Sequence, residues 1–176
     1  MEYINKDVFG EFALSGSIFL SCLNSPDFSD SYNLVYGHHM DNGGMFGDVL
    51  EFENTDYFEA HQTGTLYLPH KTFPVTLFAC MKADAYDRLI YSPGPEYDLQ
   101  ELLDYLESSA VQYRDIGVTA DDRIIGLSTC VDQRPCHFIW QAGRKISTRR
   151  RCNEIKCIRE SETCCFIRSF RLCLQF

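Results

Sequence analysis

The chain has 176 residues, which is enough for one domain with a hydrophobic core. Its hydrophobic content of 45% and aromatic content of 14% are typical of a folded globule and exclude a disordered chain. The net charge of −9 argues against a general nucleic-acid binder, and the absence of any run of about 18 apolar residues excludes a membrane-spanning helix. Met1 leads directly into polar residues, so we expect no signal peptide in this chain.

The first part of the chain predicts two short strands. Residues 17–20 have the pattern of a short buried strand after a turn at Gly16, and residues 34–36 form a second, apolar run entered from a polar stretch. Asp41-Asn42-Gly43-Gly44 is a strong turn signal directly after the second run.

Two short helical segments are expected next. Apolar residues between Phe46 and Phe52 recur near helical spacing, which favours a short helix. Residues 56–60 have the composition of a further helical turn, for which Thr55 or Asp56 would be the N-cap.

A pair of strands follows, at residues 65–68 and 73–81, joined by a turn near His70 and Lys71. Pro74 has no backbone N–H to donate. It therefore places the second strand at a sheet edge, or makes that strand begin just after the proline.

The clearest helix begins at Asp98, whose side chain is suited to cap it, and is expected to run to about Tyr113. Its leucines follow at i, i+3, i+4 and i+7: Leu99, Leu102, Leu103 and Leu106. Strands are expected at 124–130 and 137–141. The whole pattern predicts a mainly β architecture, a closed or nearly closed barrel, with short helices and a longer helix before the strand that ends in Cys130.

Two of the predicted strands lead into side chains suited to nucleophilic catalysis. The run 124–130 ends in Cys130, and the run 34–40 presents His38 after a tight turn at Gly37. A thiol can be held as a thiolate by a nearby protonated imidazole, and the imidazolium can protonate a departing amine. Each residue taken alone fits a buried structural role as well, so both interpretations are open at this point.

Several motifs, in order along the chain, resemble those of the class B sortases. They are Tyr36-Gly37-His38-His39-Met40, Gly44-Met45-Phe46-Gly47 and Leu127-Ser128-Thr129-Cys130, preceded by Tyr3-Ile4-Asn5-Lys6-Asp7 and Gly16-Ser17-Ile18-Phe19-Leu20. The resemblance runs from about residue 3 to residue 133, and the helix before the cysteine strand also resembles the one that marks class B. Each motif is weak alone, whereas the ordered set is highly specific.

The resemblance implies a closed sortase-type β-barrel and a cysteine transpeptidase on the outer face of a Gram-positive membrane. Such enzymes cut a sorting signal near the C-terminus of a secreted protein, hold the acyl fragment as a thioester and pass it to a peptidoglycan or pilin amine. The implied partners are thus a sorting-signal peptide and an amine acceptor, with no nucleic acid. The implied membrane contact is an N-terminal anchor absent from this chain.

The same resemblance assigns roles to individual residues. Cys130 matches the nucleophile and His38 the acid/base partner, whereas its neighbour His39 is not expected to be catalytic. Tyr36 and Ser128 match positions that line the peptide groove. Asp132, two residues past the cysteine, suits orientation of the histidine, although an ordinary loop carboxylate is the preferred interpretation.

The chain departs from the family pattern at the third catalytic group. The family places an arginine at the start of the last strand, in a pattern like Gly-Arg-aromatic-Ile, to stabilise an oxyanion. Here that place has Cys136-His137-Phe138-Ile139-Trp140. Arg134 in the preceding turn is the nearest candidate, although it lies outside the expected register; His137 lacks the fork and permanent charge of a guanidinium.

Cysteine and charge set the end of the chain apart. The last 28 residues hold five of the nine cysteines and seven Lys or Arg against three Glu, a net of +4, which leaves −13 for the rest. We therefore assign residues 1–145 to a sortase-like catalytic domain and 146–176 to an atypical basic, cysteine-rich tail, with a frameshift as the hypothesis for its origin. No two tail cysteines have the Cys-x-x-Cys spacing of zinc sites, so we expect no metal and no cofactor.

Three functions remain open from the sequence. The first is a cysteine transpeptidase of the class B sortase type. The second is a catalytically impaired homologue that only binds sorting-signal peptides, a hypothesis motivated by the displaced arginine. The third is a thiol hydrolase that releases the acyl group to water and differs only in the acceptor.

Overall fold

The computed structural model describes residues 5–7, 9–68, 71–129, 136–143, 164–167 and 170–173. For Lys71 and for the segments from residue 136 onward it describes the backbone alone. The predicted His70–Lys71 turn lies partly outside this range, because residues 69 and 70 are not described.

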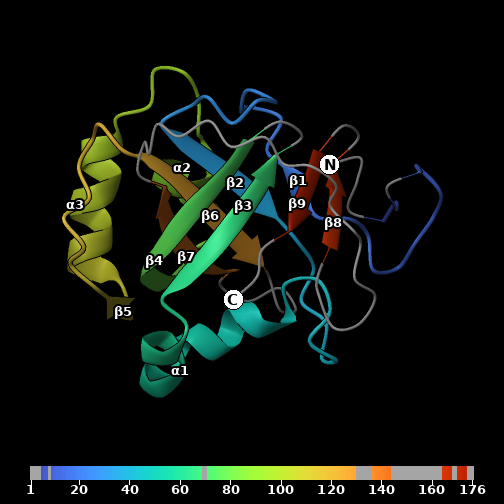
Figure 1. Ribbon diagram of the computed structural model, residues 1–176, viewed down its shortest axis with the longest axis horizontal. Helices are drawn as coiled ribbons and strands as arrows, with labels where there is room; N and C mark the ends of the chain where they lie inside the picture. The colour runs from blue at the N-terminus through green and yellow to red at the C-terminus, as the bar shows by residue number, and fades with distance from the viewer. Residues whose placement is uncertain are drawn as a thin grey trace.

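Strands dominate the fold, as the sequence predicts, and most of them join one seven-stranded sheet (Figure 1). The strands are β1 (Phe19–Leu20), β2 (Tyr32–Tyr36), β3 (Thr63–Leu68), β4 (Lys71–Ala83), β5 (Gln112–Tyr113), β6 (Arg123–Thr129), β7 (Cys136–Gly143), β8 (Cys164–Ile167) and β9 (Phe170–Cys173). The helices are η1 (Gly47–Glu53), α1 (Thr55–Ala60), α2 (Arg88–Tyr91) and α3 (Leu99–Ser109). The sheet order is β1-β2-β6-β7-β4-β3, and β5 pairs with β4.

The central strands are buried on both faces. Alternate residues of β2 and β6, such as Val35 and Ile125, join a hydrophobic cluster with η1 and α1. Their neighbours Leu34 and Ile124 join a second cluster with α2 and α3 on the opposite face. Continuous apolar runs are the sequence signature of strands covered on both sides, which explains why these strands could be found from sequence.

Helix α3 begins where the sequence predicts and ends four residues early. The Asp98 carboxylate accepts the backbone N–H groups of Gln100 and Glu101, so Asp98 is the N-cap. The prediction that the helix runs to Tyr113 is wrong, because Gln112 and Tyr113 pair with β4 as strand β5. The Gln112 side chain also donates to the Glu53 carbonyl and to the Thr55 hydroxyl, contacts that a continued helix would lose.

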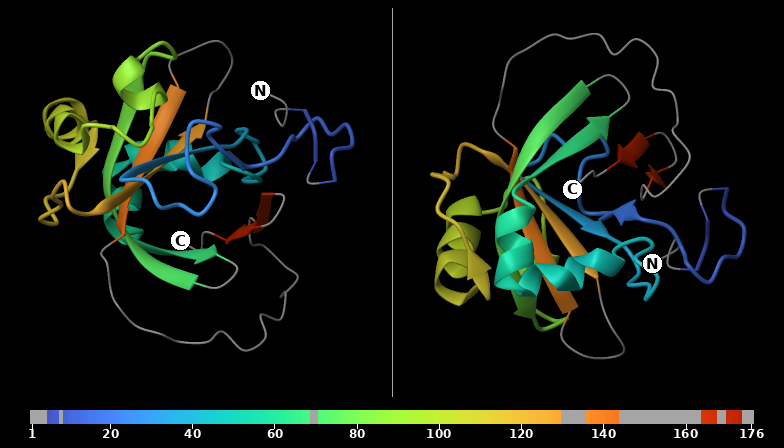
Figure 2. Two further views of the ribbon diagram at one scale, coloured as in Figure 1. Left: turned by 90° about the horizontal axis from the view of Figure 1, so that it is seen from above. Right: turned by 60° about the horizontal axis from the view of Figure 1, so that its bottom comes forward.

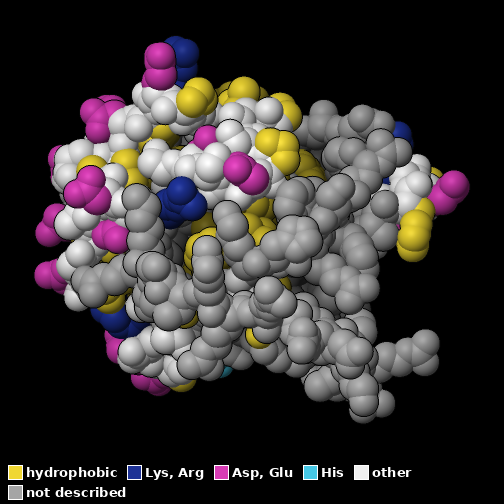
Figure 3. All heavy atoms as spheres, turned by 45° about the horizontal axis from the view of Figure 1, so that its top comes forward, with side chains coloured by type: hydrophobic (Ala, Val, Ile, Leu, Met, Phe, Trp, Pro, Cys, Tyr) yellow, Lys and Arg dark blue, Asp and Glu magenta, His cyan; other side chains and the backbone are white. Residues whose placement is uncertain are grey.

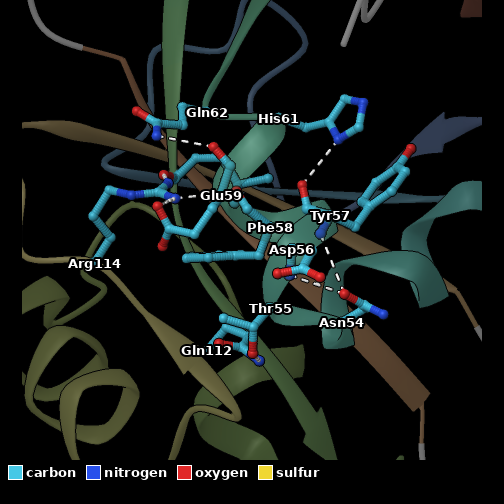
Figure 4. A network of polar contacts seen from close by, with 11 residues as sticks. Asn54, Thr55, Asp56, Tyr57, Phe58, Glu59, His61, Gln62, Gln112 and Arg114 are labelled. Carbon is cyan, nitrogen blue, oxygen red and sulfur yellow. Dashed lines mark hydrogen bonds and ion pairs between the residues drawn. The ribbon is translucent and has the colours of Figure 1, made fainter.

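Helix α1 begins at Thr55, but its cap differs from both sequence candidates. The Asn54 side chain accepts hydrogen bonds from the backbone N–H groups of Asp56 and Tyr57 (Figure 4). Thr55 and Asp56 are instead the first helical residues. The preceding turn, η1, has 3₁₀ geometry and covers the region expected to be a short helix.

Pro74 lies inside β4 rather than before it, so the prediction that the strand starts after the proline is wrong. Pro74 pairs with Thr65 of β3, whereas pairing between β4 and β7 begins only at Thr76. Within the described strands, β4 therefore has a partner on one side at Pro74. The missing N–H faces that unpaired side, which agrees with the edge position also expected from sequence.

The tail contributes the antiparallel pair β8–β9, which the sequence pattern does not predict. This pair lies beside β3 and β1, the two end strands of the sheet (Figure 2). Nothing in the described residues tests whether 146–176 form a separate unit or arose by a frameshift. Among the described residues no helix is long and apolar enough to cross a membrane.

Arg114, the residue directly after β5, contacts helix α1 through its side chain (Figure 4). Its guanidinium donates to the carbonyls of Leu77 and Phe58 at 2.9 and 3.0 Å, lies 4.4 Å from the centre of the Phe58 ring, and pairs with Glu59 at 3.1 Å. The Arg114 side chain is only 17% exposed, whereas that of Glu59 is 58% exposed. The carbonyl and ring contacts of Arg114, rather than its ion pair with Glu59, therefore stabilise the packing of α1 against β4 and β5.

Replacing Arg114 with methionine is expected to lower the free energy of unfolding by about 2 kcal/mol, since two carbonyls lose a charged donor. Glu59→Gln is the matched control and is expected to cost less than about 1 kcal/mol. Urea unfolding monitored by circular dichroism measures both values. Equal losses in the two variants would show that the ion pair is the main contribution.

Candidate functional site

The two strands that carry the predicted catalytic motifs are parallel neighbours. Tyr36, the last residue of β2, lies opposite Ser128 of β6, and the Gly37 N–H donates to the Ser128 carbonyl at 3.1 Å. Parallel neighbours leave the sheet at the same edge. The strand ends that lead to His38 and to residue 130 are therefore adjacent, although 91 positions of sequence separate Gly37 from Ser128.

Several predicted site residues lie outside the described residues. Thr129 is the last described residue of β6, so the structure places neither Cys130 nor Asp132 nor Arg134. For His137 only the backbone is described, in β7 opposite Thr129. The roles expected for these residues stay predictions.

His38 stands at the base of a short hairpin loop. Its carbonyl accepts the Phe46 N–H at 2.9 Å, and His39 bridges to Met45 in antiparallel fashion. Gly43 and Met45 have positive φ angles of 74° and 53°, which let the chain reverse tightly between them. His38 is half-buried at the point where this loop joins the sheet, so its backbone is fixed on both sides.

Gly37 permits a close packing contact beneath His38. A Cβ atom added at Gly37 would lie 2.7 Å from the Phe46 ring and 3.0 Å from Ile18. Phe46 and Ile18 are 5% and 2% exposed, so neither side chain has free space to retreat. Only glycine fits between β2 and this part of the core.

Tyr36 and Ser128, the predicted groove residues, lie on adjacent strands and meet a third residue, Tyr91 of α2. The Tyr36 ring stacks on Phe19 of β1 and on Tyr91, with ring centres 5.3 and 6.3 Å apart. Burial raises the pKa of the Tyr91 hydroxyl to about 12, and a hydrogen bond with Ser128 acts in the opposite direction. Burial likewise raises the pKa of Tyr36, offset in part by a hydrogen bond with Ser21.

Tyr91 is the residue of this group that the sequence did not reveal. It belongs to a helix of four residues that has no periodicity to detect, and its partner Ser128 is 37 positions away. Ser128 itself is only 2% exposed, so Tyr91 and the neighbouring strands cover its side chain.

The side chain of His39, which is expected not to be catalytic, contacts a residue of its own loop. Its Nε2 lies 3.4 Å from a carboxylate oxygen of Asp41, which is fully exposed. Its Nδ1 is buried and has no hydrogen-bond partner among the described residues. His38 and His39 therefore occupy different environments despite being adjacent.

No family model matches the chain. Sortase B of Listeria monocytogenes is 31% identical over 145 residues, which are 82% of this chain and 57% of that protein. The crystal structure of Spy0129, a Streptococcus pyogenes class B sortase involved in pilus biogenesis, matches with a TM-score of 0.71 and 36% identity, covering 81% of this chain and 80% of that one. The chain belongs to the class B sortase family.

Another structural match to this class B sortase is a Staphylococcus aureus sortase B–substrate complex, with a TM-score of 0.67 and 25% identity over 81% of this chain and 68% of that one. The family assignment confirms the predicted fold class, which is mainly β with few helices. The chain spans 57% and 54% of the two curated sortase B proteins that it matches. The family consists of cysteine transpeptidases. Because the chain spans little more than half of these relatives, its own activity is a proposal.

Two cysteines of this class B sortase have described side chains, Cys22 and Cys80, and neither is suited to replace Cys130. Cys80 is fully buried in β4, and burial raises the pKa of its thiol to about 12, so it stays protonated at neutral pH. Cys22 is exposed on a loop after β1. Among the described residues no group of His, Cys, Asp or Glu could hold a metal ion.

Labelling of the native protein with iodoacetamide at about pH 8 is expected to modify Cys22 and to leave Cys80 untouched, because the reagent needs an accessible thiolate. Peptide mapping by mass spectrometry identifies the labelled positions. Unfolding in urea should make Cys80 reactive, which serves as the internal control. Labelling of native Cys80 at the rate of Cys22 would contradict the burial seen here.

Proposed function

We propose that this class B sortase is a cysteine transpeptidase in which Cys130 is the nucleophile and His38 the acid/base partner. The observation that carries the proposal is the parallel register of β2 and β6, with Tyr36 opposite Ser128. Extending this register by two positions leads to His38 on one strand and to Cys130, which lies outside the described residues, on the other. Adjacent strands are about 4.8 Å apart, which suits a thiolate–imidazolium pair.

The alternation of side chains also supports this pairing. Gly37 packs on Phe46 and Ile18, and Thr129 follows Ile125 and Leu127 at alternate positions, so both continue the face of β2 and β6 that packs against η1 and α1. A strand that continued this alternation would turn the next residues, His38 and Cys130, to the face of Tyr36 and Ser128. The proposed site is thus bordered by the half-buried rings of Tyr36 and Tyr91.

In the proposed reaction, the Cys130 thiolate attacks the scissile carbonyl carbon of a sorting signal and forms a tetrahedral intermediate. The C–N bond then breaks, the His38 imidazolium gives its proton to the departing amine, and a thioester remains. An acceptor amine attacks the thioester, His38 takes a proton from it, and the thiolate leaves. The products are a new amide and the free enzyme.

The oxyanion of each tetrahedral intermediate needs a hydrogen-bond donor or a cation. We propose Arg134 for this role, because it is the nearest arginine in sequence to Cys130 on its C-terminal side. It stands four residues after Cys130 in the sequence and before the position that the family pattern gives to the arginine. Replacing Arg134 by alanine without a change in rate would remove it from the mechanism.

For the substrate and acceptor, the proposal follows the family: a C-terminal sorting signal of a secreted protein, and an amine of the cell wall or of a pilin subunit. The sortase B–substrate complex supports a peptide ligand for this fold. The proposed location is the cell surface of a Gram-positive bacterium.

Incubation with a library of sorting-signal peptides, followed by intact-mass measurement, tests the proposed function. We expect an adduct with the mass of the N-terminal acyl fragment, absent in Cys130→Ala, that disappears when an amine is added. Absence of any adduct across the library would contradict the transpeptidase proposal. An adduct that decays to free acid at the same rate with and without amine would identify a hydrolase instead.

A further inference from the structure

The described part of the molecule contains a preformed hollow that the proposed chemistry does not use. It has a volume of about 670 Å³ and lies between α2 and the start of α3. Its lining comprises Arg88, Leu89, Ser92, Gly94, Pro95, Glu96, Tyr97, Asp98 and Glu101. A hollow of this size is within the range of ligand sites.

The walls of the hollow are held in place without a ligand. The Tyr97 hydroxyl donates to the Leu89 carbonyl, its backbone N–H donates to the Gly94 carbonyl at 3.2 Å, and its ring lies 5.2 Å from that of Tyr32. Asp98 is fixed as the cap of α3. Because these groups are already ordered, little conformational entropy is lost when a ligand enters.

The lining combines apolar surface with carboxylates that have no ion-pair partner among the described residues. Glu96 and Glu101 are exposed, and neither lies within ion-pair distance of a cation among the described residues. Arg88 is also exposed and lies within ion-pair distance of no described carboxylate. Leu89 and Tyr97 are half-buried and supply the apolar part. With three carboxylates and one guanidinium, the lining has a net negative charge.

The surrounding surface has the same sign. Residues 84–122 contain ten Asp or Glu and two Arg, so this segment carries nearly all of the net charge of −9. Acidic side chains gather on the side of the molecule where α3 lies (Figure 3). Such a field attracts cations and accelerates their association.

Helix α2 links the hollow to the proposed catalytic site. Arg88 and Leu89 line the hollow, whereas Tyr91, on the same four-residue helix, stacks on Tyr36. A peptide seated in the hollow would therefore lie against the helix whose last residue borders the candidate site.

We propose that the hollow between α2 and α3 binds a basic, partly apolar peptide segment of the substrate protein, outside the sorting signal that is cleaved. The identification of that protein as the substrate rests on the proposed function. Lysine or arginine side chains of the segment pair with Glu96 and Glu101, and its apolar side chains pack on Leu89 and Tyr97.

Direct binding of a fluorescent probe peptide, Lys-Leu-Lys-Leu-Lys with blocked ends, tests the site independently of catalysis. We expect the full chain to bind this probe and not the matched Glu-Leu-Glu-Leu-Glu peptide. Glu101→Lys is expected to weaken binding about fivefold to tenfold, and Glu107→Lys by less than about twofold. Glu107 is the matched control because it is exposed on α3 and does not line the hollow.

Gly94→Trp is the blocking variant. Gly94 lines the hollow, and a Cβ added there meets no heavy atom within 4 Å, so the site tolerates a side chain at its start. We expect the cationic probe to lose binding in this variant, with an unchanged Tm. Equal binding of the two peptides, or unchanged binding in both Gly94→Trp and Glu101→Lys, would overturn the proposal.

A kinetic comparison connects the hollow to the substrate. With a sorting-signal peptide extended by a Lys-Leu-Lys segment, Glu101→Lys should raise KM about fivefold and leave kcat unchanged, whereas the unextended peptide should show no change. An equal effect on both peptides would contradict the proposal. If neither peptide forms an adduct with the wild-type chain, the proposed function fails, and the binding result still decides whether the hollow is a site.

Discussion

Replacement of Cys130 by alanine is expected to abolish acyl-enzyme formation, and His38→Ala to lower kcat/KM by about 10³-fold or more. The thiol supplies the bond that holds the acyl fragment, and neither cysteine with a described side chain is suited to replace it: Cys80 is buried and Cys22 lies on a loop after β1. The proposal gives His38 the proton-transfer role, since extending the β2–β6 register two positions past Tyr36 and Ser128 leads to His38 and to the position of Cys130. Intact mass and steady-state transfer kinetics measure the two effects.

His39→Ala is the matched control for His38→Ala. It removes an imidazole from the adjacent position, whose ring lies near the exposed Asp41. We expect this variant to keep most of its activity. A loss in His39→Ala as large as that in His38→Ala would mean that the register does not identify the acid/base residue.

Gly37→Ala is expected to lower the free energy of unfolding by about 1–3 kcal/mol, because the added Cβ would lie 2.7 Å from the buried Phe46 ring. For a chain of this size the corresponding fall in Tm is about 2–4 °C per kcal/mol. The same clash shifts His38, which is the next residue and whose carbonyl accepts the Phe46 N–H. Differential scanning calorimetry and transfer kinetics therefore should both report a loss.

Two further variants make this prediction specific to the contact. Gly94→Ala adds the same methyl group where no heavy atom lies within 4 Å, and it should leave Tm within about 2 °C of the wild type. Phe46→Leu combined with Gly37→Ala should recover part of the loss, since the smaller side chain makes room. If the double variant loses as much free energy of unfolding as the two single variants added together, the contact with Phe46 is not the cause.

Local sequence signals located most elements but not all of their ends. The leucine spacing and the Asp98 cap identified α3, because helix periodicity and capping are local properties. Its C-terminal end was wrong because Gln112 and Tyr113 pair with β4, a contact that no local signal shows. The Asn54 cap was missed because Thr55 and Asp56, equally good cap residues, follow it directly.

By itself, the sequence determined which side chains stand at the ends of apolar strands, and hence that His38 and Cys130 are candidates for nucleophilic chemistry. Only the tertiary structure decided that the two strands are parallel neighbours in register, because pairing between segments about 90 residues apart depends on the burial of both sheet faces rather than on local propensity. It also decided the contact of Tyr91 with Ser128 and the hollow beside α2, which arise when separate elements pack against the same sheet.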